Sequence, residues 1–180
     1  VDGKVFFSWE MNNADRNIMQ SAWQILVSSD EQSLEGDKGS FWDSGKVISG
    51  ETLQNLYNGK ALQSGTRYYW KVRVWDGKDI VTPYTDITWF ETGLLKATDW
   101  KGTWIGEGKI PPEKSEDFYK KIPAPLFRKS FVVKKEVSKA RLYVCGLGYH
   151  EIFLNGKKAN DLHLEPGWTQ FGKTVFYNVH

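Results

Sequence analysis

The run Tyr-Tyr-Trp-Lys-Val-Arg-Val-Trp at residues 68–75 limits the fold of this chain more than any other stretch of its sequence. Trp70, Val72 and Val74 in this run are separated by single cationic residues. Because successive side chains of a β-strand point to opposite faces, this alternation predicts a strand with one apolar and one polar face. The apolar face must lie against a core, so the sequence predicts a layered β-structure.

Strand signals recur along the first half of the chain, whereas helical periodicity is almost absent. Further strands are expected at Val5–Trp9, Ala22–Val27 and Trp89–Thr92. Turn-forming sequences separate the runs: Asp43-Ser44-Gly45, Asn58-Gly59, Ser64-Gly65 and Asp76-Gly77. Short strands between regular turns are typical of a β-sandwich, and we place this first module at residues 1–93.

The second half of the chain predicts a second, incomplete sandwich. Residues 94–122 indicate a connector, since the stretch Gly106–Pro125 is rich in Gly, Pro, Lys and Glu. Thr103–Ile105 nevertheless has the pattern of a short strand. Asn155-Gly156 predicts a type I′ hairpin turn, because that turn needs positive φ at both central residues. Strand runs are expected at 126–133, 140–145, 149–154, 157–164 and 174–177.

These runs are about five strands, whereas a jelly roll has about eight. The expected fold class is therefore all-β: a fibronectin III or immunoglobulin-like sandwich at 1–93, and a partial jelly-roll or galactose-binding-like sandwich at 123–180. The second sandwich must be completed by sequence outside this chain, by another chain, or by the first module, because an unfinished sheet leaves an unpaired edge.

Charge and cysteine content exclude several classes of function. The 180 residues contain 24 Lys and Arg against 22 Asp and Glu, so the net charge of +2 does not indicate a nucleic-acid partner or an anionic membrane surface. No apolar run approaches the roughly 20 residues of a membrane span. With Cys145 as the single cysteine, no disulfide can form within the chain, and the strand-like run around it predicts a buried, inert thiol.

Nine Trp residues are unusual for a chain of this length. Tryptophan supplies buried area to a small core, and it also supplies flat faces on which sugars stack. Trp168 lies in a Pro-Gly loop and Tyr149 follows Gly148 at a strand start, so these two rings, with Asn155 and Glu165, are the candidate sugar-binding residues. The alternative is that Trp168 packs over its own sandwich or against a further domain.

Catalytic and metal-binding motifs do not stand out. None of the three histidines neighbours a Gly-x-Ser-x-Gly elbow, and there is no CxxC or HExxH sequence. Asn155, Asp161 and Glu165 are weak candidates for a calcium site, and the alternative is that they are ordinary polar residues of turns and loops. We assign no catalytic residue, because the carboxylates are scattered: Glu91, Asp99, Glu151, Asp161 and Glu165.

The first module resembles a fibronectin type III sandwich. Trp9 is similar to the core Trp of that fold's second strand, and Leu62–Tyr68 is similar to the leucine, turn and tyrosine before its sixth strand. In such folds the tyrosine hydroxyl bonds to nearby backbone, so Tyr68 is expected to be structural. The first strand of the fold is expected to be very short or to lie ahead of Val1.

Nearly the whole chain resembles the N-terminal accessory region of bacterial α-L-rhamnosidases of glycoside hydrolase family 78. The order and spacing of many short motifs carry this resemblance, not any single one of them. The motifs are residues 7–9, 20–27, 42–47, 69–76, 90–95, Asp99-Trp100, Trp104-Ile105, 127–129, 140–143, 146–157 and 165–169.

The resemblance implies an enzyme that hydrolyses terminal α-L-rhamnose with inversion, using carboxylates in a downstream helical (α/α)6 barrel. This chain would then be a non-catalytic segment, inactive alone, that supports the catalytic domain of the same polypeptide and contacts rhamnose-containing glycans. Such bacterial enzymes are often exported, which implies a periplasmic or extracellular location. The alternative is a free-standing fibronectin-like module that binds carbohydrate or protein in adhesion.

Overall fold

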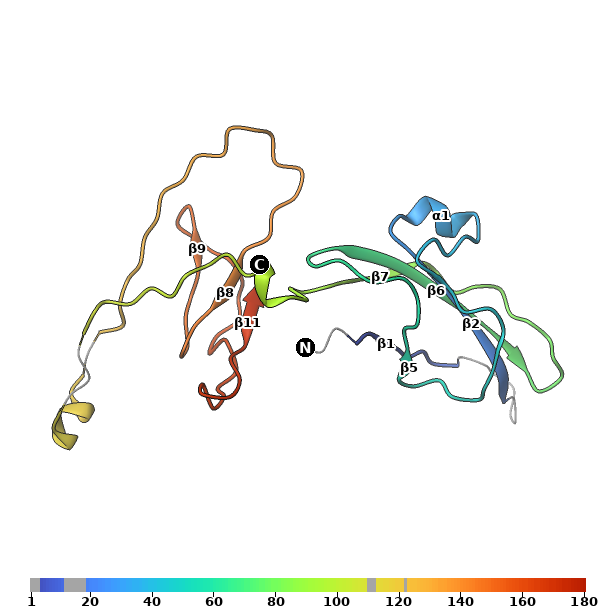
Figure 1. The fold of residues 1–180 in the computed structure, drawn as a ribbon, viewed down its shortest axis with the longest axis horizontal. Coiled ribbons are helices and arrows are strands. Elements are labelled where there is room, and N and C mark those ends of the chain that lie inside the picture. Colours follow the sequence, from blue (N-terminus) through green and yellow to red (C-terminus); the bar gives the residue numbers. More distant parts are fainter. Residues whose placement is uncertain (1–3, 12–18, 110–112, 122) are drawn as a thin grey trace. The chain divides into compact units, whose positions relative to one another are not determined.

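The computed structural model describes residues 4–11, 19–109, 113–121 and 123–180 (Figure 1). The chain forms two compact units, Val1–Gly102 (unit 1) and Thr103–His180 (unit 2), between which residues 94–122 are divided. The predicted all-β class is confirmed, and no helix in the described ranges is long and apolar enough to cross a membrane. The elements are β1 (Phe6–Phe7), β2 (Gln20–Ser28), α1 (Glu31–Glu35), β3 (Trp42–Asp43), β4 (Val47–Ile48), β5 (Asn55–Leu56), β6 (Arg67–Asp76), β7 (Thr88–Glu91), η1 (Ala97–Asp99), η2 (Ser115–Tyr119), β8 (Tyr143–Cys145), β9 (Phe153–Leu154), β10 (Lys157–Lys158) and β11 (Tyr177–Val179).

Unit 1 is built on the long antiparallel pair β2–β6. Its main sheet has the order β3-β2-β6-β7, with β4 also paired to β2, while β1 and β5 form a separate two-stranded layer. In the register of the central pair Ile25 lies opposite Val72 and Val27 opposite Trp70. Figure 1 shows β1 and β5 on one side of this pair and α1 on the other.

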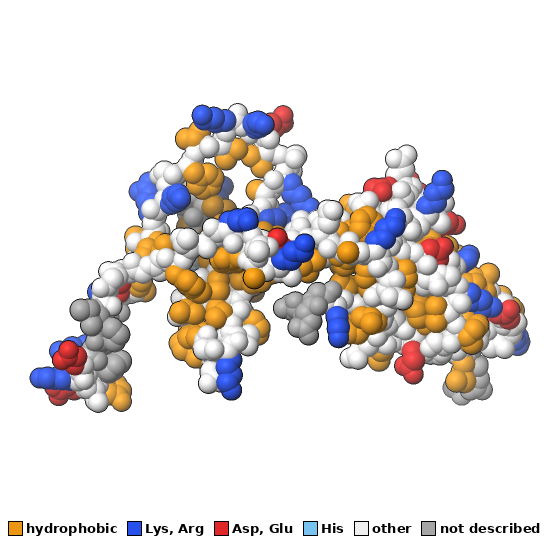
Figure 2. Space-filling view, viewed as in Figure 1, with side chains coloured by type: hydrophobic (Ala, Val, Ile, Leu, Met, Phe, Trp, Pro, Cys, Tyr) orange, Lys and Arg blue, Asp and Glu red, His pale blue; other side chains and the backbone are white. Residues whose placement is uncertain are grey.

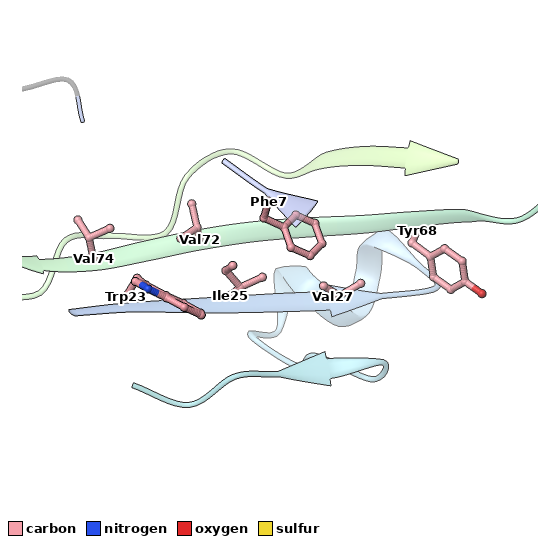
Figure 3. Close-up of a cluster of buried hydrophobic side chains, with 7 residues drawn as sticks. All are labelled: Phe7, Trp23, Ile25, Val27, Tyr68, Val72 and Val74. Carbon is pink, nitrogen blue, oxygen red and sulfur yellow. The ribbon is translucent and has the colours of Figure 1, made fainter. Parts of the chain in front are cut away.

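The core of unit 1 lies between the two layers, as the alternation at residues 68–75 predicts. Phe7 of β1 points onto the β2–β6 pair (Figure 3), and its ring centroid is 4.6 Å from that of Trp70 and 5.7 Å from that of Phe90. Trp9, in the predicted core position, packs against this cluster with its ring 5.8 Å from Trp23. The buried cluster is Phe7, Trp23, Ile25, Val27, Tyr68, Val72 and Val74.

Tyr68 has the structural role that its place before the sixth fibronectin strand predicts. Its side chain is fully buried, and its hydroxyl accepts a hydrogen bond of 2.9 Å from the backbone N–H of Gln63. Its ring also packs against Phe41 and Phe90, with centroids 4.8 and 5.5 Å away. The prediction that this hydroxyl holds the turn ahead of β6 is therefore confirmed.

The second face of β2 is buried as well, and the short helix that lies against it was not predicted. Ala22, Leu26 and Ser28 on this face are fully buried, and α1 packs on β2 and β6. Asp30 caps the helix by accepting a 2.8 Å hydrogen bond from the N–H of Ser33, and bonding to Ser33 lowers the pKa of the Asp30 carboxyl. Leu34, fully buried, anchors the helix.

Cationic side chains stack on aromatic rings along this outer face of the sheet. The polar residues of β6 supply most of the cations, and Lys71 also bonds to Leu34 O and Asp37. Arg73 donates from Nε and Nη2 to Gln24 Oε1, at 2.9 and 2.7 Å. Stacking of this kind stabilises by about 0.5–2 kcal/mol per pair, so these pairs add to the cover that α1 gives to this face. The pairs are Arg67–Trp89 (3.8 Å from cation to ring centroid), Lys71–Tyr84 (4.6 Å), Arg73–Tyr84 (4.6 Å), Arg73–Trp75 (5.2 Å) and Lys46–Trp75 (4.8 Å).

Unit 2 contains two short antiparallel pairs among its described residues, β8–β11 and β9–β10. The β9–β10 hairpin turns at Asn155 and Gly156, whose φ angles are 51° and 81°. Both values are positive, so the prediction of a type I′ turn is confirmed. In the other pair Tyr177 lies opposite Cys145, and the strand begins three residues later than the predicted run at 174–177.

The expected strands at 126–133 and Thr103–Ile105 are not formed, which corrects the prediction for this unit. The alternation in residues 126–133 is real, but a strand needs a hydrogen-bonded neighbour, and this run has none in the described part of the chain. Its apolar side chains stay exposed, Leu126 at 94% and Val132 at 84%. Figure 2 shows hydrophobic side chains on the surface of this unit, including the region of β8, β9 and β11.

Candidate functional site

Tyr149 and Trp168, which the sequence singles out for sugar contact, lie together in unit 2. An isolated antiparallel bridge joins His150, which follows Tyr149, to Glu165, which lies three residues before Trp168. The N–H of His150 donates to the carbonyl of Glu165 at 2.8 Å. The two rings meet edge to face, with centroids 5.5 Å apart and planes at 61°. Both remain open to solvent, Tyr149 at 54% and Trp168 at 67%. A sugar ring can therefore reach them.

The loop that carries Trp168 is held by its own hydrogen bonds. The carbonyl of Gln170 accepts from the N–H groups of Lys173 and Thr174, at 2.8 and 3.0 Å. The hydroxyl of Thr169 donates to the carbonyl of Thr174 at 2.6 Å. The turn places Phe171 against Trp168, with ring centroids 5.1 Å apart. Phe171 is a third aromatic member that sequence reasoning missed, although its spacing of three residues from Trp168 in one tight loop was a usable signal.

The two polar candidates, Glu165 and Asn155, differ in their relation to the aromatic pair. The carboxylate of Glu165, three residues before Trp168, accepts a 2.9 Å hydrogen bond from the side-chain amide of Asn160. Asn155 lies in the β9–β10 turn, where its positive φ gives it a conformational role. No described contact joins Asn155 to the aromatic pair, so its part in sugar binding stays a prediction from the sequence.

A group of ionisable side chains around the β9–β10 hairpin was not predicted. Lys158 Nζ donates to Glu151 Oε1 at 2.8 Å and lies 3.2 Å from His163 Nδ1. The hydrogen bond from Lys158 is the largest cause that lowers the pKa of the Glu151 carboxyl. All three side chains reach solvent, so their pairing contributes little to stability.

The calcium candidates do not share a described contact. Glu165 is engaged by Asn160, Asn155 is in the turn, and Asp161 is exposed. In the described ranges no group of three or more His, Cys, Asp or Glu side chains is placed to hold a metal ion. Calcium therefore stays a prediction for this unit.

The other ionisable groups considered from the sequence lie in separate local networks. Glu91 pairs with Arg67 at 3.5 Å, and Asp99 bonds to Ser64. Cys145 is partly buried in β8, and burial raises the pKa of its thiol, which disfavours the reactive thiolate. What the aromatic group offers chemically is a stacking surface with hydrogen-bonding side chains nearby.

These features define a class of protein: an immunoglobulin-like β-sandwich followed by a second β unit that presents aromatic side chains. The chain belongs to the family described as Rha78A-like, N-terminal immunoglobulin domain, whose model matches residues 2–96. The model of the α-L-rhamnosidase N-terminal domain matches residues 135–180. The predicted resemblance to the N-terminal region of α-L-rhamnosidases is thereby confirmed.

Individual relatives agree with both matches. An α-L-rhamnosidase of Formosa agariphila is 35% identical over 185 residues, which are 95% of this chain and 19% of that protein. The solved α-L-rhamnosidase from Dictyoglumus thermophilum is 36% identical over 96% of this chain and 20% of that one, with a TM-score of 0.83. The solved Streptomyces avermitilis α-L-rhamnosidase, complexed with L-rhamnose, is 38% identical over 58% of this chain and 10% of that one, with a TM-score of 0.54. This chain therefore spans about a fifth of the length of the curated relatives it matches.

Proposed function

We propose that this chain is the non-catalytic accessory segment of an α-L-rhamnosidase that removes terminal α-L-rhamnose from glycosides. The observation that carries the proposal is the match to α-L-rhamnosidases over 95% of this chain and only 19% of the relative. The segment supports a catalytic domain of the same polypeptide, in the periplasm or outside the cell. The free-standing adhesion module is not favoured, because the similarity to rhamnosidases runs through both units.

The aromatic group of unit 2 supports a second part of the proposal, which is weak binding of sugar. A pyranose has an apolar face of C–H groups that packs on an aromatic ring, while its hydroxyls need hydrogen-bonding partners. Trp168 and Tyr149 offer exposed rings whose centroids lie 5.5 Å apart. Glu165, which bridges to His150 next to Tyr149, offers a carboxylate that is paired with the amide of Asn160. We expect affinities in the millimolar range, because the rings lie on an open surface.

Turnover of an aryl α-L-rhamnoside tests the non-catalytic role. The 180-residue chain is assayed beside the full polypeptide of its source gene at equal molar concentration. We expect activity from the full polypeptide alone. Turnover by the chain itself, in preparations that remain active through successive purification steps, would contradict the proposal.

Saturation-transfer NMR on L-rhamnose tests the sugar site without relying on a Trp signal from the protein. Trp168→Ala should abolish the transfer, and Tyr149→Ala should weaken it. Trp104→Ala is the matched control, because Trp104 lies in the same unit and has the same 67% exposure as Trp168. Equal transfer in Trp168→Ala and Trp104→Ala would contradict the proposed sugar site.

The calcium prediction is tested separately, by repeating the saturation-transfer measurement with added calcium and then with a chelator.

A further inference from the structure

The chain that leaves β7 is tied back to the turn that precedes β6. The N–H of Gly65 donates to the carbonyl of Gly93 at 3.1 Å, and the N–H of Leu95 donates to Ser64 Oγ at 2.9 Å. The Ser64 hydroxyl in turn donates to the carboxylate of Asp99. One serine side chain therefore accepts from one part of the departing segment and donates to another.

Asp99 closes the segment on itself. Its carboxylate also accepts from the N–H of Lys96 at 3.1 Å, while its own N–H donates to the carbonyl of Lys96 at 3.0 Å. These two bonds close the single turn η1, after which Trp100 N donates to the carbonyl of Ala97 at 3.3 Å. The hydrogen bond from Ser64 is the largest cause that lowers the pKa of Asp99, as expected for a carboxylate held by donors.

The same turn is fixed to the core of unit 1. Thr92 Oγ1 accepts from Thr66 N at 3.0 Å and donates to the carbonyl of Gln63, and Gln63 N donates to the buried Tyr68 hydroxyl at 2.9 Å. A continuous set of hydrogen bonds thus leads from a buried ring to the departing segment. Ser64 is joined to this set through its carbonyl, which accepts from Thr66 Oγ1 at 3.1 Å.

We propose that Ser64, Leu95, Lys96 and Asp99 form a clasp that makes residues 93–100 a fixed extension of unit 1. Residues 93–100 then move with unit 1, instead of forming part of a flexible segment that starts directly after β7. Without these bonds, a segment of this kind, with exposed Lys96, Ala97 and Thr98, would behave as a flexible connector. Ser64 and Asp99 are positioning residues, and this inference does not depend on the rhamnosidase activity.

Limited proteolysis with trypsin on the 180-residue chain tests the clasp directly. Cleavage after Lys96 requires the clasp to open, whereas Lys109 lies in an exposed stretch without strands. In the wild-type chain we expect much slower cleavage after Lys96 than after Lys109. Ser64→Ala should raise the rate of cleavage after Lys96, relative to that after Lys109, by about threefold or more. One hydrogen bond corresponds to roughly three- to tenfold, and Ser64 Oγ makes two. Thr98→Ala is the control, because Thr98 is exposed within η1, and it should leave the ratio unchanged.

Amide hydrogen exchange separates opening of the clasp from unfolding of unit 1. In Ser64→Ala the N–H groups of Leu95 and Lys96 should exchange faster, while those of β2 and β6 keep their wild-type rates. If Ser64→Ala also raises exchange in β2, Asp99→Asn provides the test from the other side of the clasp. Equal cleavage after Lys96 and Lys109 in the wild type, or a ratio that neither variant changes, would overturn the proposal.

Discussion

Tyr68→Phe removes one oxygen atom from the centre of unit 1, and its cost can be worked out from the structure. The ring stays buried against Phe41 and Phe90, so packing is preserved. The loss is the 2.9 Å hydrogen bond from Gln63 N, whose donor then faces a phenyl edge. Leaving a shielded N–H without a partner costs about 1–3 kcal/mol. For a domain of this size each kcal/mol lowers Tm by about 4–8 °C.

Urea unfolding followed by Trp fluorescence measures this cost, since seven of the nine Trp residues lie in unit 1. Tyr57→Phe is the matched control. Its side chain is only partly buried, and its hydroxyl donates to the carbonyl of Lys60 at 2.7 Å at the edge of the core, so we expect a loss smaller than that of Tyr68→Phe, about 0.5–1 kcal/mol. A Tyr68→Phe cost no larger than that of Tyr57→Phe would refute the role given to the buried hydroxyl.

Other outcomes follow from the same structure. Burial raises the pKa of Tyr57 to about 12, so its phenol should stay protonated at pH 11 in an absorbance titration at 295 nm. The contribution of this phenol to the stability of unit 1 should be complete below pH 10 and should be lost as the pH rises through 12. Arg73→Leu should lower the stability of unit 1 by about 1–2 kcal/mol in urea, because two bonds to Gln24 and two ring contacts are lost. Because the pKa of Asp99 is lowered in the folded protein, the clasp should be fully formed above the ordinary Asp pKa of about 3.9 and should open as the pH falls through the lower pKa of the folded state. Faster amide hydrogen exchange at Leu95 would show this opening. Gly156→Ala should destabilise the β9–β10 hairpin by about 1 kcal/mol, because φ is 81° there, and NMR shifts of the hairpin would report it.

The central sheet of unit 1 was predictable because local pattern and tertiary environment agree. In β6 the alternation of apolar and cationic residues matches a core on one face and a covered polar face on the other. In β2 the run at 22–27 has no alternation, and the reason appears only in three dimensions: both faces are buried. The helix α1 was missed because five residues carry no periodicity, although Asp30 followed by Ser33 and then Gly36 was a capping signal.

Pairing partners explain what could not be predicted in unit 2. Residues 126–133 have the pattern of a strand, but a pattern cannot supply the hydrogen-bonding neighbour that a strand requires. Conversely, the sequence predicts Tyr149 and Trp168 as sugar contacts for different reasons, one at a strand start and the other in a loop. The bridge between His150 and Glu165 brings the two rings together. That bridge joins residues on either side of the β9–β10 hairpin and has no local signature.

The β2–β6 pair also sets how unit 1 can fold. Gln24 and Arg73, which face each other across this pair, lie 49 residues apart in the sequence. A contact between residues this far apart forms only after the chain has closed a large loop, which costs entropy before the contact contributes any stabilisation. For this reason all-β domains fold on the millisecond-to-second time scale. During synthesis β2 emerges well before its partner, with apolar side chains on both faces. We therefore expect insertions that lengthen the loops between β2 and β6 to slow the folding of unit 1.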